Sequence, residues 1–178
     1  MGWRAVSRER RARASPGRAG SATTRSTGGR SSPGVASDGA VQRAYLGVLY
    51  ERLGELDEAD REYRTAVRLA PKDPNVLNTY GGFLCRTGKR KDGIKYLLRA
   101  AENPVYTTPE AAFVNAATCA RGIPDLESAE TYLRRAIRVA PYFREALIQL
   151  ADLSLETGRP LQARAFVQRF EDAGPATA

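Results

Sequence analysis

The side chains best suited to covalent chemistry in this sequence are two cysteines, Cys85 and Cys119, and the chain contains no histidine. It therefore lacks the commonest general base and the commonest metal ligand. Two cysteines without a histidine partner also cannot form a standard zinc site. Two chemistries remain open for them. One is a pair of buried free thiols, the default in the cytosol, and the other is a disulfide bond in an oxidising compartment.

Other catalytic signatures are missing from the sequence. No glycine-rich phosphate loop follows a strand, and no alternation of apolar and polar residues indicates a strand. We therefore expect a protein that is not an enzyme and that needs no cofactor and no metal.

The net charge of +8 is concentrated at the start of the chain. Residues 1–38 contain eight arginines against Glu9 and Asp38 and carry +6, whereas the other 140 residues carry +2. With almost no large apolar residue, this stretch is predicted to be a disordered tail. The mixed charge of the remainder indicates no nucleic-acid partner. The alternative is that the tail itself binds nucleic acid, through Arg8, Arg10, Arg11 and Arg13.

The rest of the chain is organised by a repeat, which must position the two cysteines. Similar patterns of apolar and small residues begin near residues 40, 74, 110 and 144, at intervals of 34, 36 and 34 residues. Helical spacing on both sides of a turn predicts two amphipathic helices in each copy. The expected helices span residues 40–53, 56–69, 74–86, 90–102, 109–121, 125–139, 142–157 and 160–172.

Small residues at one position of each copy allow the two helices of a pair to pack closely: Gly47, Gly81, Ala117 and Ala151. Three first helices end at Gly54, Gly88 and Gly158. Glycine has no Cβ atom, so a positive φ costs it little free energy at a helix end. The period and these positions are typical of the tetratricopeptide repeat (TPR). We predict an all-α TPR superhelical solenoid of about four helix-turn-helix repeats. An unrelated antiparallel bundle is the alternative.

The predicted TPR domain covers residues 39–172 and is followed by a flexible end, 173–178. Its repeats lie near residues 40–73, 74–107, 110–143 and 144–172. Six residues of the first helix are apolar or aromatic and cannot all face the second: Tyr45, Leu46, Val48, Leu49, Tyr50 and Leu53. This helix is therefore expected to expose an apolar face, like an inner helix without a neighbour before it.

The repeat places Cys85 and Cys119 on the first helices of neighbouring copies. A disulfide is predicted if the chain is exported, on condition that the two Cα atoms lie within about 7 Å. Otherwise both remain free thiols.

In a solenoid of this kind the first helices line the inner, concave surface, which suits an extended peptide or a partner helix. For Asn78, a buried structural role and a peptide-binding role are both open, and the structural role is preferred. The residues predicted to bind a protein partner in this groove are Asn75, Asn78, Arg86, Val114, Thr118, Arg121, Glu145, Ile148, Gln149 and Asp152.

Three segments resemble the PilF/PilW family of type IV pilus biogenesis and stability proteins: VLNTYGGFLC at 76–85, NAATC at 115–119 and PVY at 104–106. The resemblance covers about residues 44–170. It implies a non-catalytic scaffold that supports assembly or stability of the secretin, the ring through which the pilus passes. It also implies a lipoprotein on the periplasmic face of the outer membrane of a Gram-negative bacterium.

The sequence as written departs from that family at its start. It has no apolar signal-peptide core and no lipidation cysteine near the N-terminus, and residues 1–38 look unlike the family. No stretch is long enough to span a bilayer. A generic cytosolic TPR adaptor is therefore the alternative function, and the cytoplasm the alternative location.

Overall fold

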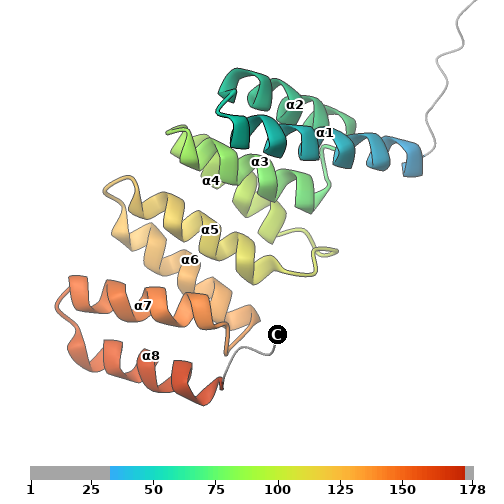
Figure 1. The fold of residues 1–178 in the computed structure, drawn as a ribbon. Coiled ribbons are helices and arrows are strands. Elements are labelled where there is room, and N and C mark those ends of the chain that lie inside the picture. Colours follow the sequence, from blue (N-terminus) through green and yellow to red (C-terminus); the bar gives the residue numbers. More distant parts are fainter. Residues whose placement is uncertain (1–32, 175–178) are drawn as a thin grey trace, which may run out of the picture. The chain divides into compact units, whose positions relative to one another are not determined.

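The computed structural model describes residues 33–174, which belong to one compact unit within residues 31–178. In this range the chain forms eight α-helices and no strand, so the all-α prediction is confirmed (Figure 1). The first four helices are α1 (Pro33–Leu53), α2 (Leu56–Leu69), α3 (Pro74–Arg86) and α4 (Arg90–Ala101). The others are α5 (Pro109–Arg121), α6 (Leu126–Val139), α7 (Arg144–Glu156) and α8 (Pro160–Asp172).

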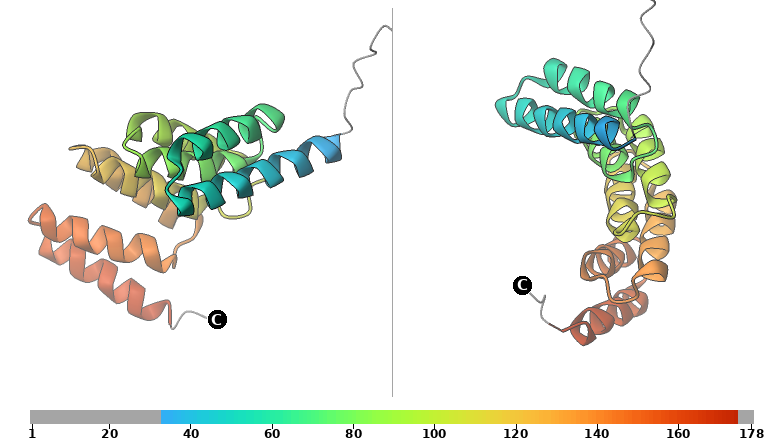
Figure 2. Two further views of the ribbon diagram at one scale, coloured as in Figure 1. Left: turned by 45° about the horizontal axis from the view of Figure 1, so that its top comes forward. Right: turned by 90° about the vertical axis from the view of Figure 1, so that its right-hand side faces the viewer.

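The helices form four hairpins, α1/α2, α3/α4, α5/α6 and α7/α8, which follow one another in chain order (Figure 2). Each hairpin packs on the next through its second helix, as in α4 against α5. The backbones of the odd-numbered helices also approach one another in sequence, α1 to α3, α3 to α5 and α5 to α7, whereas no two even-numbered helices of the described unit have Cα atoms within 8 Å of each other. One side of the stack is thus a continuous row of α1, α3, α5 and α7, which we call the odd-helix face.

The turns explain why the helices end close to the predicted positions. Gly54, Gly88 and Gly158 have φ values of 81°, 86° and 70°, the left-handed conformation predicted for them. At the start of α3, the Asp73 carboxylate accepts hydrogen bonds from the backbone N–H groups of Asn75 and Val76. This cap satisfies donors that the helix itself leaves without partners.

Close packing within a hairpin depends on a small residue facing a large one. A Cβ atom added at Gly47 would lie 2.8 Å from the Tyr63 ring, and one added at Gly81 would lie 2.8 Å from Leu97 Cγ. Tyr63 and Leu97 are both fully buried. The core therefore runs along the whole stack as a series of interlocked hairpin interfaces.

The first helix differs from its prediction in length. It begins at Pro33 instead of near residue 40, so it extends into the segment predicted as the tail, residues 1–38. The remainder of the predicted tail, residues 1–32, lies outside the described residues.

The apolar face expected on α1 is present. Leu49, at the tenth position of its repeat, is 54% exposed, whereas Phe83, Cys119 and Leu153 at the same position are 1%, 3% and 1% exposed. In α3, α5 and α7 this position is covered by the preceding hairpin. None of the helices within residues 33–174 is both long enough and apolar enough to cross a membrane.

Candidate functional site

The odd-helix face is held together by side chains that bridge from one repeat to the next. Between α1 and α3, Arg86 makes a two-pronged contact with Glu51, with Nε–Oε1 and Nη2–Oε2 distances of 2.6 and 3.0 Å. The Tyr63 hydroxyl donates to the same carboxylate at 3.1 Å. The hydrogen bond from Arg86 is the main reason that the pKa of Glu51 lies below its ordinary value, against the opposing effect of burial. Glu51 is therefore an anion at neutral pH.

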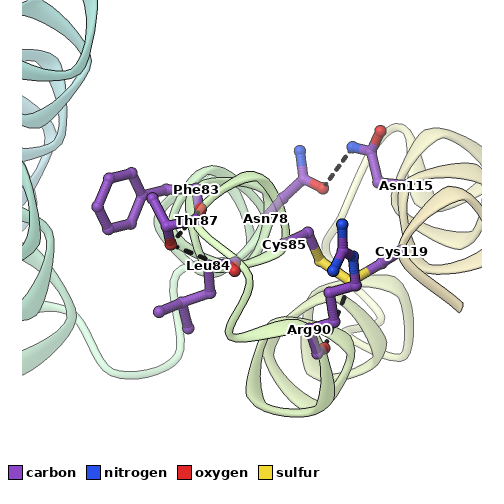
Figure 3. The surroundings of a disulfide bond; sticks show 8 residues. All are labelled: Asn78, Phe83, Leu84, Cys85, Thr87, Arg90, Asn115 and Cys119. Carbon is purple, nitrogen blue, oxygen red and sulfur yellow. Dashed lines mark hydrogen bonds between the residues drawn. A yellow bond between two sulfur atoms is a disulfide. The ribbon is translucent and has the colours of Figure 1, made fainter. Parts of the chain in front are cut away.

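Between α3 and α5 the bridge is an amide pair and a disulfide. Asn115 Nδ2 donates to Asn78 Oδ1 at 3.1 Å, and Cys85 is bonded to Cys119 with a Cα–Cα distance of 5.5 Å (Figure 3). That distance meets the condition stated for a disulfide between these residues. The two cysteines are thus the covalent part of the contact between the second and third repeats.

The disulfide lies close to the start of α4. Cys119 Sγ is 3.3 Å from the carbonyl oxygen of Arg90. Because a disulfide sulfur carries no hydrogen, we regard this as a packing contact and not as a hydrogen bond. Gly93 of α4 packs against the other sulfur, since a Cβ added there would lie 2.5 Å from Cys85 Sγ and 2.7 Å from the Gly81 carbonyl oxygen.

Between α5 and α7 two further pairs complete the row. Thr118 Oγ1 lies 3.4 Å from Gln149 Oε1, and Arg121 forms an ion pair with Glu156. Arg121–Glu156 repeats the Arg86–Glu51 contact with the signs exchanged, because the acidic partner is now on the later helix.

The structure separates the residues predicted to bind a partner into three groups. Five of them bridge neighbouring odd-numbered helices: Asn78, Arg86, Thr118, Arg121 and Gln149. Four are exposed and have no side-chain hydrogen bond or ion pair within the described part of the chain: Asn75, Glu145, Ile148 and Asp152. For Asn78, the structural alternative agrees with its contact to Asn115.

The remaining residue, Val114, does not belong to the face. It is 1% exposed and packs in the core with Leu77 and Phe113. In this structure the Val114 side chain is therefore not open to a partner, unlike the prediction for it. The reason is that α5 is contacted by α3, α4, α6 and α7, which leaves less of its surface open than the repeat position suggests.

Besides a recess around the Glu51–Arg86 pair, lined by Val48, Glu51, Arg52 and Arg86, two hollows lie on the face. One, of about 380 Å³, lies between α1 and α3 and is mainly apolar, lined by Val41, Ala44, Tyr45, Val48, Asn75, Val76 and Thr79. The other, of about 220 Å³, lies beside the disulfide and is lined by Gly82, Cys85, Arg86, Arg90, Asn115, Thr118, Cys119 and Gly122. Apolar and charged recesses along one row of helices are suited to side chains of another polypeptide.

The prediction missed two polar residues of the second hollow, Arg90 and Asn115. Asn115 carries a signal that repeat position could have revealed, because Gln149 and Thr79 occupy the same place in their repeats. Arg90 carries no such signal, since it is the first residue of α4 and reaches the odd-helix face only across the turn. Within residues 33–174, no group of three or more carboxylate or cysteine side chains is arranged to hold a metal ion.

Comparisons with known proteins agree with this architecture. A family model for the tetratricopeptide repeat matches residues 43–73. The curated type IV pilus assembly protein PilF of Pseudomonas aeruginosa is 26% identical over 135 residues, covering 76% of this chain and 54% of that protein. The chain therefore spans about half the length of this curated relative.

Two solved structures share the fold and part of the sequence. A structure of Pseudomonas aeruginosa PilF matches with a TM-score of 0.70 at 25% identity and covers 78% of this chain and 62% of that one. The crystal structure of PilW, described as a widely conserved type IV pilus biogenesis factor, matches with a TM-score of 0.64 at 26% identity over the same shares. The chain is therefore a PilF/PilW-like tetratricopeptide-repeat protein.

Proposed function

We propose that this protein is a non-catalytic scaffold in type IV pilus biogenesis that holds a polypeptide segment of a pilus-assembly component on its odd-helix face. The partner proposed is the secretin or a protein bound to it, and the effect is to support assembly or stability of the secretin ring at the outer membrane. The observation that carries the proposal is the similarity to PilF, which extends over 76% of the chain.

The organisation of the face supports a binding role. Its bridging pairs and disulfide join neighbouring odd-numbered helices, while exposed residues of mixed chemistry, among them Asn75, Ile148 and Asp152, lie on the same helices. A face whose framework is already ordered loses less conformational entropy on binding. A non-catalytic role agrees with the TPR fold and with the PilF- and PilW-like relatives.

The disulfide supports the proposed location. Disulfides form and persist in oxidising compartments such as the periplasm and are rare in the cytosol. A Cys85–Cys119 bond therefore favours the periplasmic face of the outer membrane over the alternative, a generic cytosolic adaptor.

The proposal is tested by deleting the gene in the source bacterium. We expect fewer heat-resistant secretin multimers on immunoblots of outer membranes and loss of twitching motility, both restored by the wild-type gene. Restoration should fail with a triple variant of the face, Asn75→Ala, Ile148→Ala and Asp152→Ala, all exposed residues.

A matched control changes the same chemistry on an even-numbered helix. The triple variant Leu161→Ala, Gln162→Ala and Glu171→Ala alters three exposed residues of α8 and should restore both properties. Normal secretin multimers and motility in the deletion strain would refute the role in pilus biogenesis. Cofractionation with a cytosolic partner in that case would establish the adaptor instead.

A further inference from the structure

The hollow beside the disulfide combines two arginine side chains with uncharged polar side chains. We call it the arginine pocket, and its lining includes Gly82, Arg86, Arg90, Asn115, Thr118 and Gly122. It joins the second and third repeats at the point where the disulfide ties them together (Figure 3).

Two glycines make room for the two guanidinium groups. A Cβ atom added at Gly82 would lie 3.1 Å from Arg86 Nη1, and one added at Gly122 would lie 2.9 Å from Arg90 Cδ and 3.0 Å from its Cζ. The guanidinium of Arg90 therefore lies directly against the end of α5, where any side chain at residue 122 would displace it.

The charge of the pocket is not balanced. Arg86 is neutralised by Glu51, but the guanidinium of Arg90 forms no ion pair and no side-chain hydrogen bond within residues 38–174. The other polar side chains in the lining, Asn115 and Thr118, are uncharged. The recess thus presents one uncompensated positive charge with five N–H donors in a fixed plane.

We propose that the arginine pocket binds the carboxylate of an aspartate or glutamate in the polypeptide that lies on the odd-helix face. This inference rests on the proposed function and identifies the chemistry of one contact. A guanidinium and a carboxylate match in a two-pronged geometry, which gives both strength and orientation. The disulfide and the bridge from Asn78 to Asn115 hold the two sides of the pocket in place, so little ordering is required on binding.

The test is a selection of random twelve-residue peptides displayed on phage against the oxidised full-length protein. Peptides enriched on the wild type are then titrated by fluorescence anisotropy against Arg90→Gln and Arg138→Gln. Arg138 is an exposed arginine of α6 outside the hollows, so its variant loses the same charge and keeps residues 1–38 unchanged. The wild type and both variants therefore share the arginines of residues 1–38. Any binding of acidic peptides to those arginines contributes equally to all three titrations.

We expect enrichment of aspartate or glutamate at one position of the selected peptides. Affinity should fall by about tenfold for Arg90→Gln and should stay within twofold for Arg138→Gln. Replacing the enriched acidic residue by its amide should cause the same loss on the wild type and none on Arg90→Gln. Enriched peptides that lack an acidic position, or that bind Arg90→Gln equally well, would overturn the carboxylate site but leave polypeptide binding by the face intact. The absence of any enriched peptide would count against polypeptide binding itself, and so against both proposals.

Discussion

At the scale of single residues, the second repeat is adapted to its disulfide. Three repeats have alanine where the two helices of a hairpin pack most closely, at Ala59, Ala129 and Ala163, but the second has Gly93. The sulfur of Cys85 occupies the space that a methyl group would need. Glycine at residue 93 therefore leaves the room that the Cys85 sulfur needs.

This pairing leads to a prediction that opposes helix propensity. Alanine is preferred over glycine in a helix by about 1 kcal/mol. Gly93→Ala should nevertheless destabilise the protein by about 1–3 kcal/mol, because its Cβ would lie 2.7 Å from the Gly81 carbonyl oxygen and 3.0 Å from the Cys85 backbone nitrogen. Thermal unfolding followed by circular dichroism measures the change.

The matched variant is Ala129→Gly at the same place in the third repeat. It should also destabilise, by about 1 kcal/mol, since here the alanine is fully buried and fits. A Gly93→Ala protein at least as stable as the wild type would show that α3 and α4 can separate without cost.

Glu130 gives the clearest prediction for pH. Hydrogen bonds from Arg159 and, to a lesser extent, Arg134 hold its pKa at about 2, below the ordinary value of 4.5 and against the effect of burial. Because the pKa is lowered by folding, the carboxylate stabilises the protein fully above about pH 4.5, and this contribution is lost as the pH falls towards 2.

Glu130→Gln should therefore cost on the order of 1 kcal/mol at pH 7, and the difference from the wild type should shrink between pH 4.5 and pH 2. Urea denaturation at a series of pH values measures it. Glu127→Gln, at an exposed residue of the same helix with no side-chain partner among the described residues, should show no such trend. A constant difference for Glu130→Gln across this range would contradict the assignment.

At the scale of elements, the stack is held by two kinds of contact. Hairpins close through apolar packing, while the row of odd-numbered helices is tied by polar pairs and one covalent bond. The disulfide joins α3 to α5 and closes a loop with a sequence separation of 34 residues. It therefore links two repeats and not the two helices of one hairpin.

The double variant Cys85→Ser/Cys119→Ser should be less stable than the oxidised protein by about 4 kcal/mol, the value expected from loop entropy for a separation of 34. Reductant should lower the midpoint of thermal unfolding of the wild type towards that of the variant and should leave the variant unchanged. Equal midpoints with and without reductant, after thiol titration confirms reduction, would show that the bond contributes nothing to stability.

At the scale of the whole described unit, equivalent repeat positions are not equivalent in energy. The tenth position is buried in α3, α5 and α7 because a hairpin precedes each of them, but it is exposed in α1. The same residue type occurs in both situations, as Leu49 in α1 and Leu153 in α7.

Leu153→Ala should therefore cost about 2–5 kcal/mol, as for a leucine deleted from a packed core, whereas Leu49→Ala should change stability by less than about 0.5 kcal/mol. Urea denaturation of both variants provides the comparison. Similar costs at the two positions would mean that Leu49 is covered in solution.

The sequence by itself determined the helices and their order. Helical periodicity, turn glycines and the 34-residue spacing are local properties, and all eight predicted helices occur, the seven after α1 with ends within two residues. Only the tertiary structure decided which side chains of different hairpins contact one another. Glu51 and Arg86 are 35 residues apart in the chain, as are Arg121 and Glu156, so their pairing depends on how far one hairpin is rotated against the next. The same rotation buries Val114, and the turn after α3 brings Arg90 to the odd-helix face. Repeat position specifies the direction of a side chain from its own helix, but exposure and partners depend on the neighbouring helices.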